Sequence, residues 1–208
     1  MSFIMRPVRF ASTGDANFNR VSFLSHFDGS NNDTSSAFVD SSSTGHTVSN
    51  TDFPIQSSYS PHSKADGYWS WDTQEDGYFI PAASSDFTMG TGDFTVECFV
   101  FYYGAATGGI FQMSDGPLPD SHNGIGMGVA SGGKWSAYIA NTLREHGSLY
   151  PVYRTWQHIA LVRASSTTKM YVDGVEILSF SDSTNYTGDD FTLGVWYSTT
   201  YTNDTAII

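Results

Sequence analysis

The chain has 208 residues, enough for one substantial domain, and a formal net charge of −12 at pH 7. Its 9 Lys and Arg against 21 Asp and Glu exclude the cationic footprint of a nucleic-acid binder. An aromatic content of 15% excludes an acidic disordered chain, and a single cysteine, Cys98, excludes an internal disulfide framework. Because no apolar run has the length of a signal peptide or a membrane span, we expect neither.

Residues 1–20 are predicted to form an arm that precedes the domain of residues 21–208. Arg6, Arg9 and Arg20 make this arm cationic, whereas the rest of the chain is acidic. Such charge asymmetry is typical of a segment that docks on a partner, which makes these three arginines candidate assembly contacts. The alternative is an ordinary frayed terminus.

The first half of the chain predicts short strands separated by polar stretches. An apolar segment at 21–27 stops at the turn pair Asp28-Gly29, and further extended segments are expected near 38–39 and 46–48. Residues 67–71 and 77–80 predict two strands joined by the acidic stretch 72–76. Pro81 ends the second of them, because proline cannot donate to a β-ladder.

The clearest strand is predicted from Asp93 to Tyr103. Alternation places one apolar set on a single face: Phe94, Val96, Cys98, Val100 and Tyr102. The opposite face starts polar and turns aromatic, which indicates a central strand covered on both sides for part of its length. Cys98 is interpreted as a small buried hydrophobe rather than a reactive thiol.

A second clear unit spans residues 156–180. Residues 156–163 predict one strand, and the strands 169–172 and 175–178 flank Asp173-Gly174, a pair that favours a type I′ hairpin. This register places four apolar side chains on the core face: Met170, Val172, Val175 and Ile177.

Further strands are expected at 108–113, 124–130, 134–140 and 191–197. The glycines of 124–128 are interpreted as positions where another backbone approaches closely. About a dozen short strands at this spacing predict an all-β sandwich or barrel.

Several motifs, taken in order, resemble concanavalin A-like, laminin-G-type jelly rolls. These are His26-Phe27-Asp28-Gly29, Asp40 with Gly45-His46-Thr47-Val48, Trp71-Asp72, Gly92-Asp93-Phe94-Thr95-Val96-Glu97, Trp156-Gln157-His158-Ile159-Ala160-Leu161-Val162-Arg163 and Tyr171-Val172-Asp173-Gly174. The resemblance covers about residues 22–197 and implies an all-β fold, a two-sheet antiparallel β-sandwich of the jelly-roll type.

Domains that this chain resembles occur in lectins, in adhesion modules and in phage tail and particle proteins. The resemblance therefore implies a non-enzymatic structural or adhesive component of a phage-like virion, such as a tail, fibre or decoration protein, made in a host cytoplasm. Its expected partners are other virion proteins and a second copy of itself. The family's usual last strand, with an acidic and a basic residue, is missing before Ile208. Either the sequence is part of a longer protein, or a partner supplies that strand at an open sheet edge, which invites pairing with another chain.

The alternative is a carbohydrate-binding module for cell-surface glycans, which needs aromatic side chains beside polar groups. The candidate residues are Trp135, Tyr138, Trp69, Asp120 and His122, of which Trp135, after Gly132-Gly133-Lys134, is expected to be the best exposed. The competing interpretation for each aromatic residue is core packing.

A glycoside hydrolase is the least favoured alternative. Glucanases with this type of sandwich carry an E-x-D-x-x-E run on one strand, and no Glu of this chain begins such a run. No histidine pair has metal-ligand spacing. Calcium remains a lesser alternative, at Asp72, Glu75 and Asp76 or at Asp182, Asn185, Asp189 and Asp190, although acidic loop residues are usually solvated turn formers.

Overall fold

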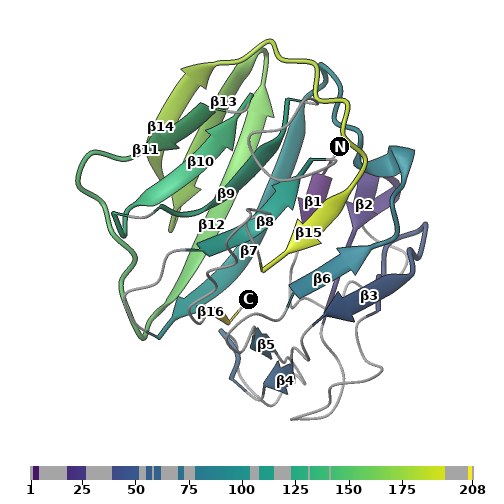
Figure 1. Ribbon diagram of the computed structural model, residues 1–208, viewed down its shortest axis with the longest axis horizontal. Coiled ribbons are helices and arrows are strands. Elements are labelled where there is room, and N and C mark those ends of the chain that lie inside the picture. The colour runs from purple at the N-terminus through teal and green to yellow at the C-terminus, as the bar shows by residue number, and fades with distance from the viewer. Residues whose placement is uncertain are drawn as a thin grey trace.

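The computed structural model describes residues 2–4, 18–26, 39–51, 55–57, 59–61, 70–72, 78–103, 108–114, 123–130, 132–140, 142–194 and 206–207. These residues form two β-sheets and the short 3-10 helices η1 (Phe18–Arg20) and η4 (Ser85–Phe87), shown in Figure 1. The predicted all-β class is confirmed. No helix in the described ranges has the length and hydropathy of a membrane span.

The first sheet is built around the two longest strands, β7 and β12, which are antiparallel neighbours. In sheet order its main path is β14 (Val175–Ser181), β13 (Thr167–Val172), β12 (Trp156–Ala164), β7 (Phe94–Tyr102), β16 (Ala206–Ile207), β5 (Ser70–Asp72) and β4 (Ile55–Ser57). Off this path, β1 (Ser2–Ile4) pairs in parallel with β7 and with β2 (Val21–Phe23).

The second sheet packs on the first and is antiparallel where its pairings are described. Its order is β11 (Thr142–Glu145), β10 (Trp135–Ile139), β9 (Ile125–Val129), β8 (Gly108–Met113), β15 (Phe191–Leu193), β6 (Tyr78–Pro81) and β3 (Val48–Thr51). The predicted strands around 67–71 and 77–80 therefore both exist, but β5 and β6 belong to different sheets and do not form a hairpin.

Alternation along β7 confirms the predicted core face, because its five apolar members, from Phe94 to Tyr102, are all buried. They pack against apolar side chains of the second sheet, including Phe111, Met127 and Trp135. Burial raises the pKa of the Cys98 thiol, and the nearby Glu97 charge raises it further, as expected of an inert buried cysteine.

The predicted hairpin at Asp173-Gly174 is also confirmed, since both residues have positive φ, 50° and 78°. Met170 and Val172 are buried as expected, but Val175 is 64% exposed, so its assignment to the core was wrong. Val175 pairs with Val172 as the predicted register requires, but it lies next to the turn on β14, the edge strand of the sheet. A register shift between Met170 and Tyr171 also pairs Met170 with Leu178 in place of Ile177.

Both ends of the described chain lie inside the first sheet, which changes two expectations. Residues 2–4 of the predicted arm form β1, which pairs with β7 along Thr95–Glu97 instead of projecting as a free segment. At the other end of β7, β16 pairs with both β7 and β5, so the expected open edge next to the C-terminus is not formed there. Figure 1 shows β16, β5 and β4 gathered at one end of the molecule. β1 and β16 pair with different parts of the same side of β7. Together they provide partners for backbone groups of this long strand that would otherwise be unpaired.

Arg163, the last residue of the Trp156–Arg163 motif, joins the end of β12 to two loops. Its buried guanidinium donates hydrogen bonds to three backbone carbonyls: from Nε to Gly92 (2.8 Å), from Nη1 to Thr184 (2.8 Å) and from Nη2 to Gly90 (2.7 Å). The rings of Phe94 and Tyr186 cover it at 4.9 and 5.0 Å. Arg163 is therefore a structural clamp that holds these two loops against the C-terminal end of β12.

Candidate functional site

Trp135, the predicted best-exposed glycan contact, is 0% exposed, so that expectation was wrong. On β10 the side chains alternate, and Trp135 shares the core face with Ala137 and Ile139. Its ring meets Tyr102 of the opposite sheet edge-on, with centroids 5.8 Å apart. The glycine turn before Trp135 thus leads into the core, and the indole cannot meet a ligand in solution.

The other predicted contacts are scattered or lie outside the described residues. Tyr138 is half-buried on the face of β10 opposite to Trp135, beside Gly126 of β9 and Leu143 of β11. Arg20 is exposed in η1. The undescribed positions are Trp69, Asp120, His122, Arg6 and Arg9, and their roles stay predictions.

Two other aromatic residues lie on the glycine turn that the sequence singled out. Tyr150 and Tyr153 are 48% and 38% exposed, and both approach Gly133. A Cβ placed on Gly133 would lie 3.6 Å from Cδ1 of Tyr150 and 4.0 Å from the hydroxyl of Tyr153. Gly133 itself has φ of +75°, a conformation that favours glycine. We call Tyr150, Tyr153 and Gly133 the tyrosine platform.

Hydrogen bonds fix the first part of the segment that carries the platform, residues 146–155. The backbone of Trp135 accepts a hydrogen bond from the N–H of His146 (3.0 Å) and donates one to the carbonyl of Leu149 (3.1 Å). The imidazole Nδ1 of His146 accepts from the backbone N–H groups of Ser148 (3.2 Å) and Leu149 (2.9 Å). These contacts tie the residues just before Tyr150 to β10 of the second sheet.

The second part of the segment is tied to the first sheet. The N–H of Val152 donates to Oε1 of Gln157 (2.7 Å), and Gln157 in turn donates to Asp173 (3.1 Å). The N–H of Arg154 donates to the carbonyl of Tyr102 at 2.7 Å. The platform therefore bridges both sheets on a backbone that is ordered before any ligand arrives, which reduces the entropy lost on binding.

The local sequence of the platform tyrosines differs from the strand patterns on either side of it. Leu149-Tyr150-Pro151-Val152-Tyr153 is an apolar run without a strand pattern, placed between two turns and interrupted by proline. Three residues of this run are exposed: the two tyrosines and Val152, which is 55% exposed. Only the tertiary structure brings this run onto the turn at Gly133.

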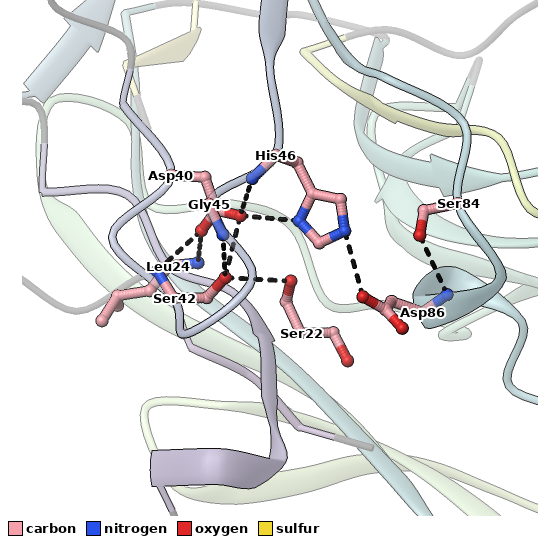
Figure 2. Close-up of polar contacts among 8 residues, drawn as sticks. All are labelled: Ser22, Leu24, Asp40, Ser42, Gly45, His46, Ser84 and Asp86. Atoms are coloured by element: carbon pink, nitrogen blue, oxygen red, sulfur yellow. Dashed lines mark hydrogen bonds and ion pairs between the residues drawn. The ribbon is translucent and has the colours of Figure 1, made fainter.

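A buried polar cluster around Asp40 is a second candidate for chemistry, and Figure 2 shows its members. Oδ1 of Asp40 accepts hydrogen bonds from the backbone N–H groups of Leu24 (3.0 Å) and Ser42 (2.8 Å). Oδ2 accepts from the Ser42 hydroxyl and the His46 N–H, both at 2.8 Å, and lies 2.7 Å from Nδ1 of His46. Nε2 of His46 lies 3.3 Å from a carboxylate oxygen of Asp86, in η4.

This Asp40 cluster is a structural junction. Burial raises the pKa of the Asp40 carboxyl, but the hydrogen bonds from Leu24, His46 and Ser42 outweigh it and leave the pKa below its ordinary value. The carboxylate is fully used in holding residues 40–46 against β2, and the His46 ring packs on Phe87 at 4.6 Å. Neither group is placed to meet a substrate, since both side chains are almost completely buried.

The acidic residues considered for calcium have structural partners where they are described. The buried Asp182 accepts hydrogen bonds from the hydroxyls of Thr168 (2.5 Å) and Tyr186 (2.9 Å) and from the N–H of Thr184 (3.0 Å). Within the described ranges, no three His, Cys, Asp or Glu side chains converge as a metal site would require. Glu75 and Asp76, and the side chain of Asp72, lie outside the described part.

The sequence was compared with protein families and known proteins. Residues 72–207, more than half of the chain, match the family described as the concanavalin A-like lectin/glucanases superfamily, in its laminin-G form. None of the curated proteins compared with the chain matches it.

Solved structures resemble the fold at low sequence identity. Domain 4 of AbnA, a GH43 extracellular arabinanase from Geobacillus stearothermophilus solved with arabinotriose, matches with a TM-score of 0.55 and 13% identity, over 80% of this chain and 84% of that one. The Trypanosoma rangeli sialidase in complex with sialic acid matches with a TM-score of 0.52 and 14% identity, over 98% of this chain and 32% of that one. This chain thus spans about a third of the sialidase, and at these identities the likeness shows the fold alone.

Proposed function

The chain belongs to the concanavalin A-like lectin/glucanase superfamily, as its motifs indicated, and we propose that it binds carbohydrate at the tyrosine platform without cleaving it. Sugar rings present an apolar C–H face that stacks on aromatic side chains, and hydroxyl groups that hydrogen-bond to polar neighbours. The platform offers both features, because two tyrosine rings with their hydroxyls lie beside the Gly132-Gly133 turn, in which Gly132 is exposed and Gly133 half-buried.

The observation that carries this proposal is the convergence of Tyr150 and Tyr153 on one glycine. An exposed tyrosine alone is unremarkable on a protein surface. Two that approach the same glycine, on a segment hydrogen-bonded to both sheets, form a prearranged aromatic surface. Tyrosine suits this role, since it offers a large contact area and loses little conformational entropy on binding.

Binding without turnover is supported by what the described carboxylates do. Asp40, Asp173 and Asp182 accept hydrogen bonds from backbone or side-chain groups that hold loops in place. A retaining glycosidase needs two carboxyl groups facing each other across the sugar, about 5 Å apart. The E-x-D-x-x-E run that would supply such a pair on one strand is absent from the sequence.

We keep the virion setting as a proposal that rests on the sequence resemblance to phage particle proteins. A tail, fibre or decoration protein that carries several copies of a weak glycan site gains avidity from its multivalency, with no change in the site itself. Purified phage-like particles that contain this chain in multiple copies would support this setting. A chain that is stably monomeric and joins no particle would remove it.

The test of the proposed function is a glycan array followed by calorimetry on the strongest binder, with Tyr150→Ala and Tyr153→Ala as variants. Each truncation should weaken binding by about tenfold, as expected when an aromatic anchor is lost. Tyr59→Ala is the matched control, because Tyr59 is similarly exposed but packs on Phe101 of the first sheet, at 5.3 Å between ring centroids.

A blank array, or binding that survives both truncations and falls in the Tyr59 variant, would contradict the proposed site. Incubation of the bound glycan with the protein should release no reducing sugar. Release that a single carboxylate-to-amide change abolishes would contradict binding without turnover.

A further inference from the structure

The tyrosine platform lies in a cationic part of an otherwise acidic chain. Between residues 121 and 172 the sequence contains one acidic residue, Glu145, and five of the nine basic residues. These are Lys134, Arg144, Arg154, Arg163 and Lys169. The remaining sequence therefore carries 20 of the 21 acidic residues and is strongly negative. In a molecule of net negative charge, a locally positive region attracts anions.

Two of the five cations adjoin the platform, and both lack an acidic partner in the described part of the chain. Lys134 follows Gly133 directly, and the exposed Arg154 follows Tyr153. The others are engaged elsewhere. Arg163 is clamped in the core 3.8 Å from Asp182, Lys169 pairs with Glu176 at 2.7 Å, and Arg144 lies over the Phe180 ring at 5.5 Å.

The backbone at Arg154 gives an independent observation. Arg154 has φ of +57°, a left-handed conformation that favours glycine or asparagine and strains other residues by about 1 kcal/mol or more. The hydrogen bond from its N–H to Tyr102 holds it there. A residue kept in a strained conformation beside an exposed aromatic pair indicates that its side chain has a use, and a guanidinium binds carboxylate or sulfate groups with two parallel hydrogen bonds.

We infer that the tyrosine platform takes an acidic glycan, a saccharide whose ring stacks on Tyr150 and Tyr153 and whose carboxylate or sulfate group pairs with Arg154 and Lys134. This inference rests on the proposed function and specifies its ligand class. Neutral sugars of the same ring structure then bind more weakly, because they leave both cations unpaired.

The experiment measures binding to saccharide pairs that differ only in charge: oligogalacturonate with its methyl ester, and lactose 3′-sulfate with lactose. The two pairs separate carboxylate from sulfate as the source of the negative charge. The preferred acidic probe should bind at least about tenfold more tightly than its neutral partner, as charge-assisted hydrogen bonds predict. Binding should weaken when the salt concentration rises from about 50 mM to 500 mM.

The variants are Arg154→Gln and Lys134→Gln, with Arg20→Gln as the control for an exposed arginine outside the platform. Glutamine keeps the backbone strain at position 154, so the thermal stability should stay unchanged while acidic binding falls by about tenfold. Binding of the neutral partner should change little in either variant.

Equal binding of acidic and neutral partners, or acidic binding unaffected by both variants, would overturn the charge inference and leave the proposed function standing. The clearest such result is a protein that binds both members of a pair equally and loses binding to both in the Tyr150→Ala variant. Failure to bind any of the four probes, together with a blank glycan array, would overturn the inference and the proposed function together.

Discussion

Replacing Arg163 by Met tests the interpretation of this residue as the clamp at one end of the sandwich. Methionine fills a similar volume and can still pack between the rings of Phe94 and Tyr186, so the change removes mainly the hydrogen bonds. The carbonyls of Gly92 and Thr184 lose donors at 2.8 Å, while the Gly90 carbonyl keeps a second donor, the N–H of Tyr186.

The expected loss follows from these contacts. A buried carbonyl without a partner costs about 1–3 kcal/mol, and breaking a buried ionic group's set of contacts costs about 3–5 kcal/mol in total. We therefore expect Arg163→Met to lower the free energy of unfolding by about 4 kcal/mol, a large part of the roughly 5–15 kcal/mol that stabilises an ordinary domain. Arg163→Lys should lose most of the same amount, since an ammonium group cannot span the three carbonyls.

Urea denaturation followed by tryptophan fluorescence and far-ultraviolet circular dichroism measures this loss. Lys169→Met is the matched control on the neighbouring strand, because its pair with Glu176 is exposed and its removal should leave the midpoint unchanged. A midpoint for Arg163→Met equal to that of the wild type would refute the clamp.

Three further predictions concern stability. Burial raises the pKa values of the Asp40 and Asp182 carboxyls, but the hydrogen bonds that each carboxylate accepts outweigh it and leave both pKa values below 3.8. The stability that these two groups contribute is therefore present above pH 3.8 and is lost as the pH falls through the lowered pKa values. Urea denaturation from about pH 6 to pH 2 should show that decline, and Asp40→Asn should flatten it; an unchanged slope would count against the assignment. Gly126→Ala should destabilise the fold by about 2 kcal/mol, since the new Cβ would lie 2.7 Å from the Phe111 carbonyl oxygen. Gly147→Ala is the control, because no atom lies within 4 Å of a Cβ at that position. Equal melting temperatures of the two variants would contradict this prediction. Arg154→Gly should raise the free energy of unfolding by about 0.5–1 kcal/mol by relieving the left-handed strain, while acidic glycans bind more weakly; a destabilised variant would show that the strain is absent.

The core strands could be predicted from the sequence because their determinants are local. Alternation along β7 and β12 identifies the buried faces, and Asp173-Gly174 specifies its own turn type. The exposure of Val175 could not be predicted for the opposite reason, since the position of β14 at the edge of the sheet depends on the order of all the strands in that sheet. Likewise, the placement of β1 and β16 along β7 depends on contacts between segments far apart in the chain.

The candidate site could be predicted only in part. The Gly132-Gly133 turn was recognised, but Trp135 was expected to be exposed because strand alternation does not say which face is covered by a second sheet. Tyr150 and Tyr153 could not be predicted as site residues, because the run that carries them has no regular period. Their approach to Gly133 is a tertiary contact across 17 residues of sequence for Tyr150 and 20 for Tyr153. The charges around the platform can be assigned only once the platform itself is known.

Chemical-shift mapping on isotope-labelled protein tests glycan binding at the tyrosine platform most directly. Titration with the strongest glycan binder should shift the backbone resonances of residues 132–134 and 149–154, and leave those of the Asp40 cluster and the Arg163 clamp in place. Saturable shifts centred elsewhere on the sandwich, or no shifts with any glycan that the arrays include, would contradict the account.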